Sequence, residues 1–223
     1  MVAFLVPVLS LKVEPPLTFT FVASATSTGG TITVPATAAE GDFCMLMQVA
    51  RNFSNTIPAA VTPAGYTTDR EAAGMTSGGE NPIRVMLSRR VLGSGEAGAS
   101  ITGMNGGGNG KVVLVFRPSR PIVGVSLVGG GAESTSTSVN PSTQTISVSG
   151  QAPPTLLFAQ ASNPGEAPTL GGSLASDGTS LNGGDASQRC AYLIQNTTPA
   201  DKTASCSGSA SVRTLVSAGY AFT

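Results

Sequence analysis

The sequence predicts an all-β protein, an antiparallel β-sandwich with an internal pseudo-repeat and an N-terminal arm. No segment sustains a helical period. Short apolar or alternating runs are instead separated by turns that hold many of the 28 glycines and 15 prolines, which is typical of sandwiches and barrels. With 223 residues, the chain can bury a sizeable core, either as one large β domain or as two small ones.

The chain also repeats the order of its segments. A short alternating strand, a Pro/Gly/Ala turn and an apolar strand occur twice, and further echoes follow in the same order while the loops change length. The matching segments are 31–51 with 145–160, 83–91 with 189–196, 99–103 with 204–208, and 111–118 with 212–222. A unit used twice suggests two similar faces that bury each other. We place the halves at about 25–128 and 143–223, although Gly/Ser/Thr-rich composition alone also produces such echoes.

The expected strands alternate in polarity or are continuously apolar. Residues 17–23 alternate cleanly, with Leu17, Phe19 and Phe21 on one face and Thr18 and Thr20 on the other. Such half-buried strands need a second sheet to cover them. In chain order, the strands are expected at 2–11, 17–23, 31–34, 42–51, 65–69, 83–92, 99–102, 111–117, 122–128, 143–148, 155–161, 189–196, 203–207 and 212–222.

Residues 1–24 are expected to form an N-terminal strand or arm, and 25–223 the sandwich. The first apolar run has no positive charge before it and is interrupted by Lys12, Glu14 and Pro15-Pro16. It therefore reads as an uncleaved strand and a Pro-Pro bend rather than a secretory signal, and it falls short of the roughly 20 apolar residues of a membrane span. The side chains expected to make an assembly contact are Phe4, Leu5, Val8 and Leu11.

The charge composition bears on the choice of partner. Only 11% of residues are charged, with 12 Lys and Arg against 12 Asp and Glu. A neutral chain argues against nucleic acid, which requires a basic excess, and against binding to an anionic membrane surface. A sparsely charged surface is better suited to being covered by copies of itself or by neighbours. The lack of Trp weakens the case for a stacking platform for sugars but leaves a polar glycan site open.

Long polar stretches separate some of the strands. Residues 129–142 are expected to be a surface connection or linker between the halves. Residues 52–82 and 162–188 are expected to be long loops at corresponding ends of the sandwich, where functional contacts are often made. Their candidate ligand residues are Tyr66, Asp177 and Asp185, although the spacing of a calcium loop is absent.

The three cysteines do not form a recognisable framework. Cys44 lies in an apolar run and is expected to be buried. Cys190 and Cys206 flank the turn NTTPADK, so a hairpin folded about Thr198 would place them opposite each other, and a cross-strand disulfide is one option. The odd count fits synthesis in a reducing cytosol.

The residue inventory predicts neither catalysis nor a cofactor. Without histidine, the chain lacks Ser-His-Asp and Cys-His systems and His-ligated metals, and its cysteines are too scattered for a zinc site. A hydrolase could still use two carboxylates, but these are better read as turn residues or solvated charges. The pairs considered are Glu40/Asp42, Asp69/Glu71 and Asp177/Asp185.

Three segments carry a family resemblance: TITVPATAAEGDFCMLMQVA from residue 31, TPAGYTTD from residue 62 and SRRVLGSGEAGASITG from residue 88. Together they resemble small virion proteins of tailed bacteriophages over roughly residues 30–120. The shared features are an alternating strand leading to a Gly-Asp turn, a Pro-Ala-Gly-Tyr turn, and a strand that ends in a Gly-Glu turn. The N-terminal arm departs from this pattern.

The resemblance implies a jelly-roll-like sandwich with a structural role as a head decoration, a head or tail appendage, or a fibre-associated subunit, and without catalytic residues. The expected assembly is a homo-oligomer, a trimer being favoured, that contacts other virion proteins, is made in the bacterial cytoplasm and resides in the virion. The arm would supply the contact, adding as a strand to a neighbour's sheet edge. Two alternatives are an adhesin that binds host-surface glycan through 52–82 and 162–188, and a hydrolase using a carboxylate pair.

Overall fold

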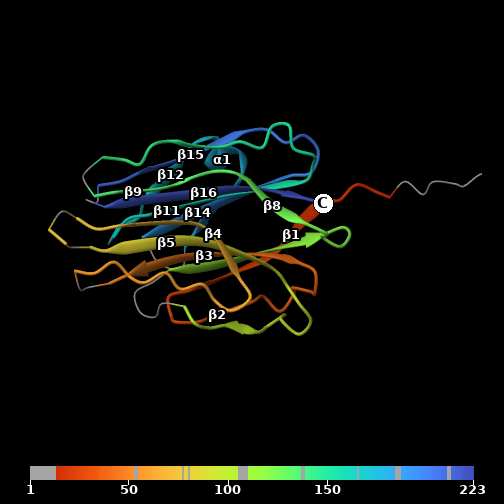
Figure 1. Cartoon of the computed structure of the whole chain (residues 1–223), viewed down its shortest axis with the longest axis horizontal. Coiled ribbons are helices and arrows are strands. Elements are labelled where there is room, and N and C mark those ends of the chain that lie inside the picture. Colours follow the sequence, from red (N-terminus) through yellow and green to blue (C-terminus); the bar gives the residue numbers. More distant parts are fainter. Residues whose placement is uncertain are drawn as a thin grey trace, which may run out of the picture.

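The computed structural model describes residues 14–52, 55–76, 78–79, 81–104, 110–136, 139–164, 166–183, 187–209 and 212–223. These residues form sixteen β-strands and one short α-helix, and every strand pair is antiparallel. The prediction of an all-β antiparallel sandwich is confirmed. Figure 1 shows the strands stacked in layers, with the red-to-green first half below the green-to-blue second half.

The first half forms a five-stranded sheet with a small outer ladder. The order of the sheet is β1 (Phe19–Ser27), β7 (Lys111–Pro118), β3 (Phe43–Arg51), β5 (Ile83–Val91) and β4 (Thr67–Gly74). The outer ladder pairs β2 (Ile32–Thr33) with β6 (Ser100–Ile101).

The second half forms a six-stranded sheet with a larger outer layer. The order is β13 (Thr179–Asn182), β14 (Gln188–Gln195), β11 (Thr155–Ser162), β16 (Arg213–Phe222) and β8 (Val125–Gly129), with β9 (Ala132–Thr135) also paired to β16. The outer layer consists of β10 (Gln144–Ile146), β15 (Lys202–Ser207) and β12 (Thr169–Gly171), together with α1 (Ser173–Asp177).

The two halves share one topology, which supports the pseudo-repeat. The first half nests its pairs as β1 with β7, β2 with β6, and β3 with β5. In the second half, β8 and β9 pair with β16, β10 pairs with β15, and β11 pairs with β14. Nested antiparallel pairing of this kind is jelly-roll-like. The register also matches, because Phe43 faces Phe116 and Val91 across its ladders while Leu156 faces Tyr220 and Ile194.

The expected boundaries of the parts need correction. The division at residue 24 cuts through β1, which is an integral strand of the first sheet. The second half begins with β8 rather than at residue 143. Residues 129–142 are not simply a linker, because β9 lies within them and pairs with β16. Gly130 and Gly131 separate β8 from β9, and Gly130 has a φ of 100° that favours glycine.

The central core lies between the two large sheets. Aromatic rings from both sheets meet there, with Phe43 against Tyr220 at 5.7 Å and Phe116 against Phe158 at 5.5 Å between ring centroids. Two further apolar clusters lie on the outer faces. One packs β2 and β6 against the first sheet through Ile32 and Ile101, and the other packs α1 and β15 against the second sheet. The molecule is therefore a four-layered stack.

The strands β3 and β11 run in the same direction on facing sheets. Gln160 Nε2 donates a 3.1 Å hydrogen bond to the backbone oxygen of Gln48 near the ends of both strands, and the ring of Phe21 in β1 stacks on Tyr192 in β14. An approximate two-fold axis along the strands relates the halves. Segments 52–82 and 162–188 thus start at the same end of the sandwich, but they contain β4 in one case and β12, α1 and β13 in the other.

Candidate functional site

The junction between the arm and the sandwich is the first candidate site. The described chain begins at Glu14, and residues 14–16 are exposed. The next side chains turn inward, because Leu17 is 2% exposed and Phe19 is 1% exposed. The chain therefore enters the core immediately after the Pro-Pro bend. The predicted contact residues Phe4, Leu5, Val8 and Leu11 lie outside the described residues.

Asn196 fixes the start of β1. Its Oδ1 accepts a 2.8 Å hydrogen bond from the Phe19 amide, and its Nδ2 donates a 2.9 Å bond to the Phe19 carbonyl. The Thr18 amide also donates to Ser119 Oγ at 3.0 Å. The Asn196 amide group thus satisfies the backbone of an edge residue as a neighbouring strand would. Since Asn196 follows β14, this contact joins the second half of the molecule to the beginning of the first.

Tyr66 lies on the outer side of the first sheet. Its hydroxyl is 3.4 Å from Cys44 Sγ, and the guanidinium of Arg90 lies over its ring at 5.8 Å from the centroid. Burial is the main cause that raises the pKa of the Tyr66 hydroxyl above its usual value. One face of the ring is therefore occupied by Arg90 and the hydroxyl points to a thiol, which is poor geometry for a sugar-stacking platform.

The turn before Tyr66 is shaped around Arg90. Gly65 has a φ of 79°, and a Cβ there would lie 2.5 Å from Arg90 Nη1, so glycine provides both the backbone conformation and the room. Arg90 Nη2 forms a 2.6 Å ion pair with Glu96 Oε1. Tyr66, Arg90 and Glu96 line a pocket of about 160 Å³. The Pro-Ala-Gly-Tyr motif thus has a packing role.

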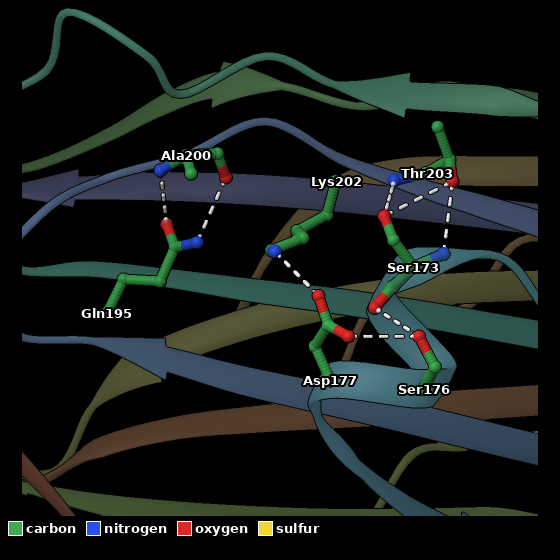
Figure 2. Close-up of polar contacts among 7 residues, drawn as sticks. All are labelled: Ser173, Ser176, Asp177, Gln195, Ala200, Lys202 and Thr203. Carbon is green, nitrogen blue, oxygen red and sulfur yellow. Dashed lines mark hydrogen bonds and ion pairs between the residues drawn. The ribbon is translucent and has the colours of Figure 1, made fainter.

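Asp177 ends α1 on the outer side of the second sheet. Its Oδ2 is 2.7 Å from Lys202 Nζ, and its Oδ1 accepts a 3.0 Å bond from Ser176 Oγ (Figure 2). The hydrogen bond from Lys202 and that from Ser176 lower the pKa of Asp177. The carboxylate therefore fastens α1 to β15, as do the hydrogen bonds of Ser173 to Thr203 in the same view.

The candidate ligand residues are not brought together. Tyr66 packs against the outer cluster of the first sheet, whereas α1 packs through Leu174 against the outer cluster of the second. These two faces lie on opposite sides of the stack. Asp185 lies outside the described residues. A glycan site formed jointly by segments 52–82 and 162–188 stays a prediction, and Tyr66 and Asp177 lie too far apart to contact one ligand there.

The expected opposition of Cys190 and Cys206 is wrong. Cys190 lies in β14 of the six-stranded sheet and Cys206 in β15 of the outer layer, and β14 does not pair with β15. Both thiols are free and buried, as is that of Cys44. In the segment between these strands, Gln195 bonds both the amide and the carbonyl of Ala200, at 3.2 and 2.9 Å (Figure 2).

Three of the other carboxylates considered for hydrolysis are engaged in structural contacts. Asp42 Oδ2 accepts a 2.8 Å bond from the Ala39 amide, as expected for a turn residue. Both of its oxygens also bond Arg117, at 3.0 and 2.9 Å. Asp69 bonds Arg89 at 2.7 Å, and Glu71 bonds Arg84 at 2.5 Å. Glu40 lines a surface groove with Asp42 and Arg117.

Sequence reasoning missed two residues that organise the molecule. The sequence places Asn196 only in a turn, and its bond to Phe19 spans 177 positions, so no local signal reveals it. The sequence around Asp69 predicts a solvated charge, whereas its side chain is only 9% exposed. Its setting depends on a bulge in β4, which the sequence does not mark with a glycine.

Comparison with known proteins gives no relative from which a role could be transferred. No family model, no curated protein and no solved structure matches the chain. Within the described residues, no group of three or more His, Cys, Asp or Glu is placed to hold a metal ion. Among the described residues, no helix is both long enough and apolar enough to span a membrane.

Proposed function

We propose that the chain is a structural subunit of a tailed-phage virion, a capsid decoration or a head or tail appendage, that acts through protein–protein assembly. The observation that carries the proposal is the anchored junction at residues 17–19. A chain segment that precedes this junction is tied to the core by Leu17 and Phe19 and to the second half by Asn196.

The sequence before the junction supplies the contact. Residues 2–11 are uncharged and largely apolar, and burial of apolar surface is the dominant favourable term in association. A partner that covers these side chains would be coupled through Pro15-Pro16 to the rigid sandwich. We propose a homo-oligomer, with a trimer favoured, that also contacts other virion proteins.

The charges support an assembly role over a hydrolytic one. The best candidate carboxylates each have a basic partner within the same chain: Asp42 has Arg117, Asp69 has Arg89, and Asp177 has Lys202. A hydrolytic pair needs carboxylates free to reach a substrate. The remaining surface is sparsely charged, which suits contact with neighbouring subunits.

The mass of the purified protein in solution tests the proposal. The full chain should run as an oligomer in light scattering, and a variant lacking residues 2–13 should run as a folded monomer. A second variant, with Phe4, Leu5, Val8 and Leu11 all changed to Ser, keeps the length of the arm and should behave like the deletion. The deletion stops before Leu17, so the buried junction is kept.

Val123→Ser is the matched control, because Val123 is an apolar side chain of the body that is 83% exposed. This variant should keep the mass of the full chain.

Phage particles made with the arm-deleted gene should lack the protein when purified particles are examined by mass spectrometry. An unchanged mass in both arm variants, or normal incorporation of the deleted form, would contradict the proposal.

A further inference from the structure

The edges of the two large sheets differ in how well they are protected. The edge strand β4 carries Asp69, Arg70 and Glu71, and β13 has only four residues. At the remaining edge of the second half, β8 is short and β9 carries Glu133. Natural sheets block their edges with charges or short strands in this way.

A bulge between Phe21 and Ala23 interrupts the register of β1 with β7, but this edge strand is otherwise the exception. It has nine residues, FTFVASATS, without a charge or a proline. Among the described residues it is paired as a strand to β7 alone. Phe21 is 38% exposed although its ring stacks on Tyr192 at 5.0 Å. The first backbone position of this edge is occupied by Asn196, which leaves the stretch from Thr20 to Ser27.

We propose that this edge of β1 receives residues 2–11 of a second copy of the chain as an added strand. The inference rests on the proposed assembly function and names the surface that accepts the arm. Ten residues in extended conformation reach about 33 Å, which covers the roughly 30 Å of a nine-residue strand. Backbone hydrogen bonds along the edge would supply affinity, and Phe21 would be covered by the added strand.

The sequence of the arm suits the outermost position in a sheet. Residues 2–11 carry no charge to oppose the uncharged edge, and they contain a single proline, Pro7. Proline is tolerated in an edge strand when the missing N–H faces solvent. The same residue would be excluded from the interior of the sheet, so the arm would be a terminal strand that stops further addition.

A second copy fits better than the chain's own arm. To pair with its own β1, the arm would have to reverse direction between Glu14 and the buried Leu17 and pass Asn196 at the start of the edge. Residues 14–16 are exposed, and Figure 1 shows this red segment leading away from the sandwich rather than back along β1. The described residues before Leu17 thus lead away from the chain's own β1 edge, which favours a neighbour's edge as the acceptor.

A labelled peptide of residues 1–16 tests the acceptor surface. It is titrated into the protein lacking residues 2–13 and followed by fluorescence anisotropy, with a scrambled peptide as control. Saturable binding is expected. Ser24→Lys places a charge at an exposed position of β1 and should weaken binding by about tenfold or more, because charged edges resist strand addition.

Ser126→Lys is the matched control, since Ser126 is an exposed serine of β8, the edge strand that corresponds to β1 in the second half. This variant should bind the peptide normally. Hydrogen exchange gives a readout without substitution, because peptide binding should slow exchange of amides in residues 20–27 and leave β4 and β13 unchanged. Thr26→Lys replaces Ser24→Lys if the latter loses its folded circular dichroism spectrum.

The outcomes separate the inference from the proposed function. If the peptide binds but protection appears on β4 or β13, or Ser24→Lys binds as tightly as the parent, the acceptor edge is wrong while assembly through the arm stands. If the peptide does not bind and deletion of residues 2–13 leaves the mass unchanged, both fail together.

Discussion

The hydroxyl of Tyr220 donates a 2.9 Å hydrogen bond to the carboxylate of Asp69 across the interface between the two large sheets. Arg89 Nε bonds the same oxygen at 2.7 Å. The bulge in β4 makes this possible, because Thr68 faces Ser88 and Arg70 faces Leu87, which leaves Asp69 as the extra residue. Asp69 and Arg70 both reach toward the second sheet, Arg70 at 3.5 Å from the carbonyl oxygen of Gly130.

Asp69→Ala should lower the free energy of unfolding by about 2–3 kcal/mol, because it leaves Arg89 and the buried Tyr220 hydroxyl without their shared acceptor. Urea unfolding followed by circular dichroism measures the change. Glu71→Ala is the control on the same strand: its pair with Arg84 is more exposed and should contribute less than about 1 kcal/mol. Equal losses for the two variants would show that Asp69 has no special role.

Gly130→Ala should be markedly more destabilising than Gly95→Ala, although both residues have positive φ. A Cβ at Gly130 would lie 2.1 Å from the Ser217 carbonyl oxygen, whereas nothing lies within 4 Å of a Cβ at Gly95. Gly95→Ala should therefore show only the backbone cost of about 1–2 kcal/mol, and Gly130→Ala should exceed it. Thermal unfolding of the two variants side by side is the measurement, and similar shifts would contradict the steric account.

The strands that form the core were predictable because their sequences contain local apolar patterns. The strand expected at 42–51 is β3 at 43–51, and that expected at 212–222 is β16 at 213–222. Both have a paired strand on each side and are buried on both faces, so their sequences are mostly apolar along the whole strand. The order of the repeated segments was equally informative, since each repeated segment occupies the same place in its half.

The elements that were missed depend on distant partners. The strand β9 is polar and is held by its register with β16, where Thr214 faces Ser134. The strand β13 is instead paired to its chain neighbour β14, and its short, largely polar sequence TSLN gives no clear strand pattern. The cysteine pairing failed because the turn after Gln195 changes layers instead of closing a hairpin. Asn196 and Asp69 act across 177 and 151 positions, beyond any local pattern.

All three cysteines should be unreactive toward thiol reagents in the native protein. Burial raises the pKa of Cys44 to about 12 and of Cys206 to about 11, and it raises that of Cys190 as well. Since the thiolate is the reactive form, labelling near pH 8 should be slow in buffer and rapid in denaturant. Unfolded, unreduced protein should take up three labels by mass spectrometry. A single label would mean that two thiols are joined after all.

The stability of the protein should fall in acid, in part through Asp201. Its carboxylate accepts 2.7 Å bonds from the amides of Val148 and Ser149, and the bond from Ser149 followed by that from Val148 lowers the pKa of Asp201 below 3.8. Because the folded-state pKa is the lower one, the unfolded chain takes up the proton first as the pH falls. The stabilisation is therefore present above pH 3.8 and is lost as the pH falls below it toward the folded-state pKa.

Asp201→Asn removes this titration while keeping a side-chain oxygen as acceptor. The variant should be less stable than the parent at pH 6, and the difference should shrink as the pH is lowered through the carboxyl range, as measured by urea unfolding at a series of pH values. Asp177→Asn is a useful second variant because the pKa of Asp177 is lowered mainly by Lys202 rather than by backbone amides. Added salt should screen the Asp177 effect more than the Asp201 effect, since an exposed ion pair is weakened by ionic strength. Parallel pH curves for the parent and Asp201→Asn would show that the two amide bonds do not favour the charged carboxylate.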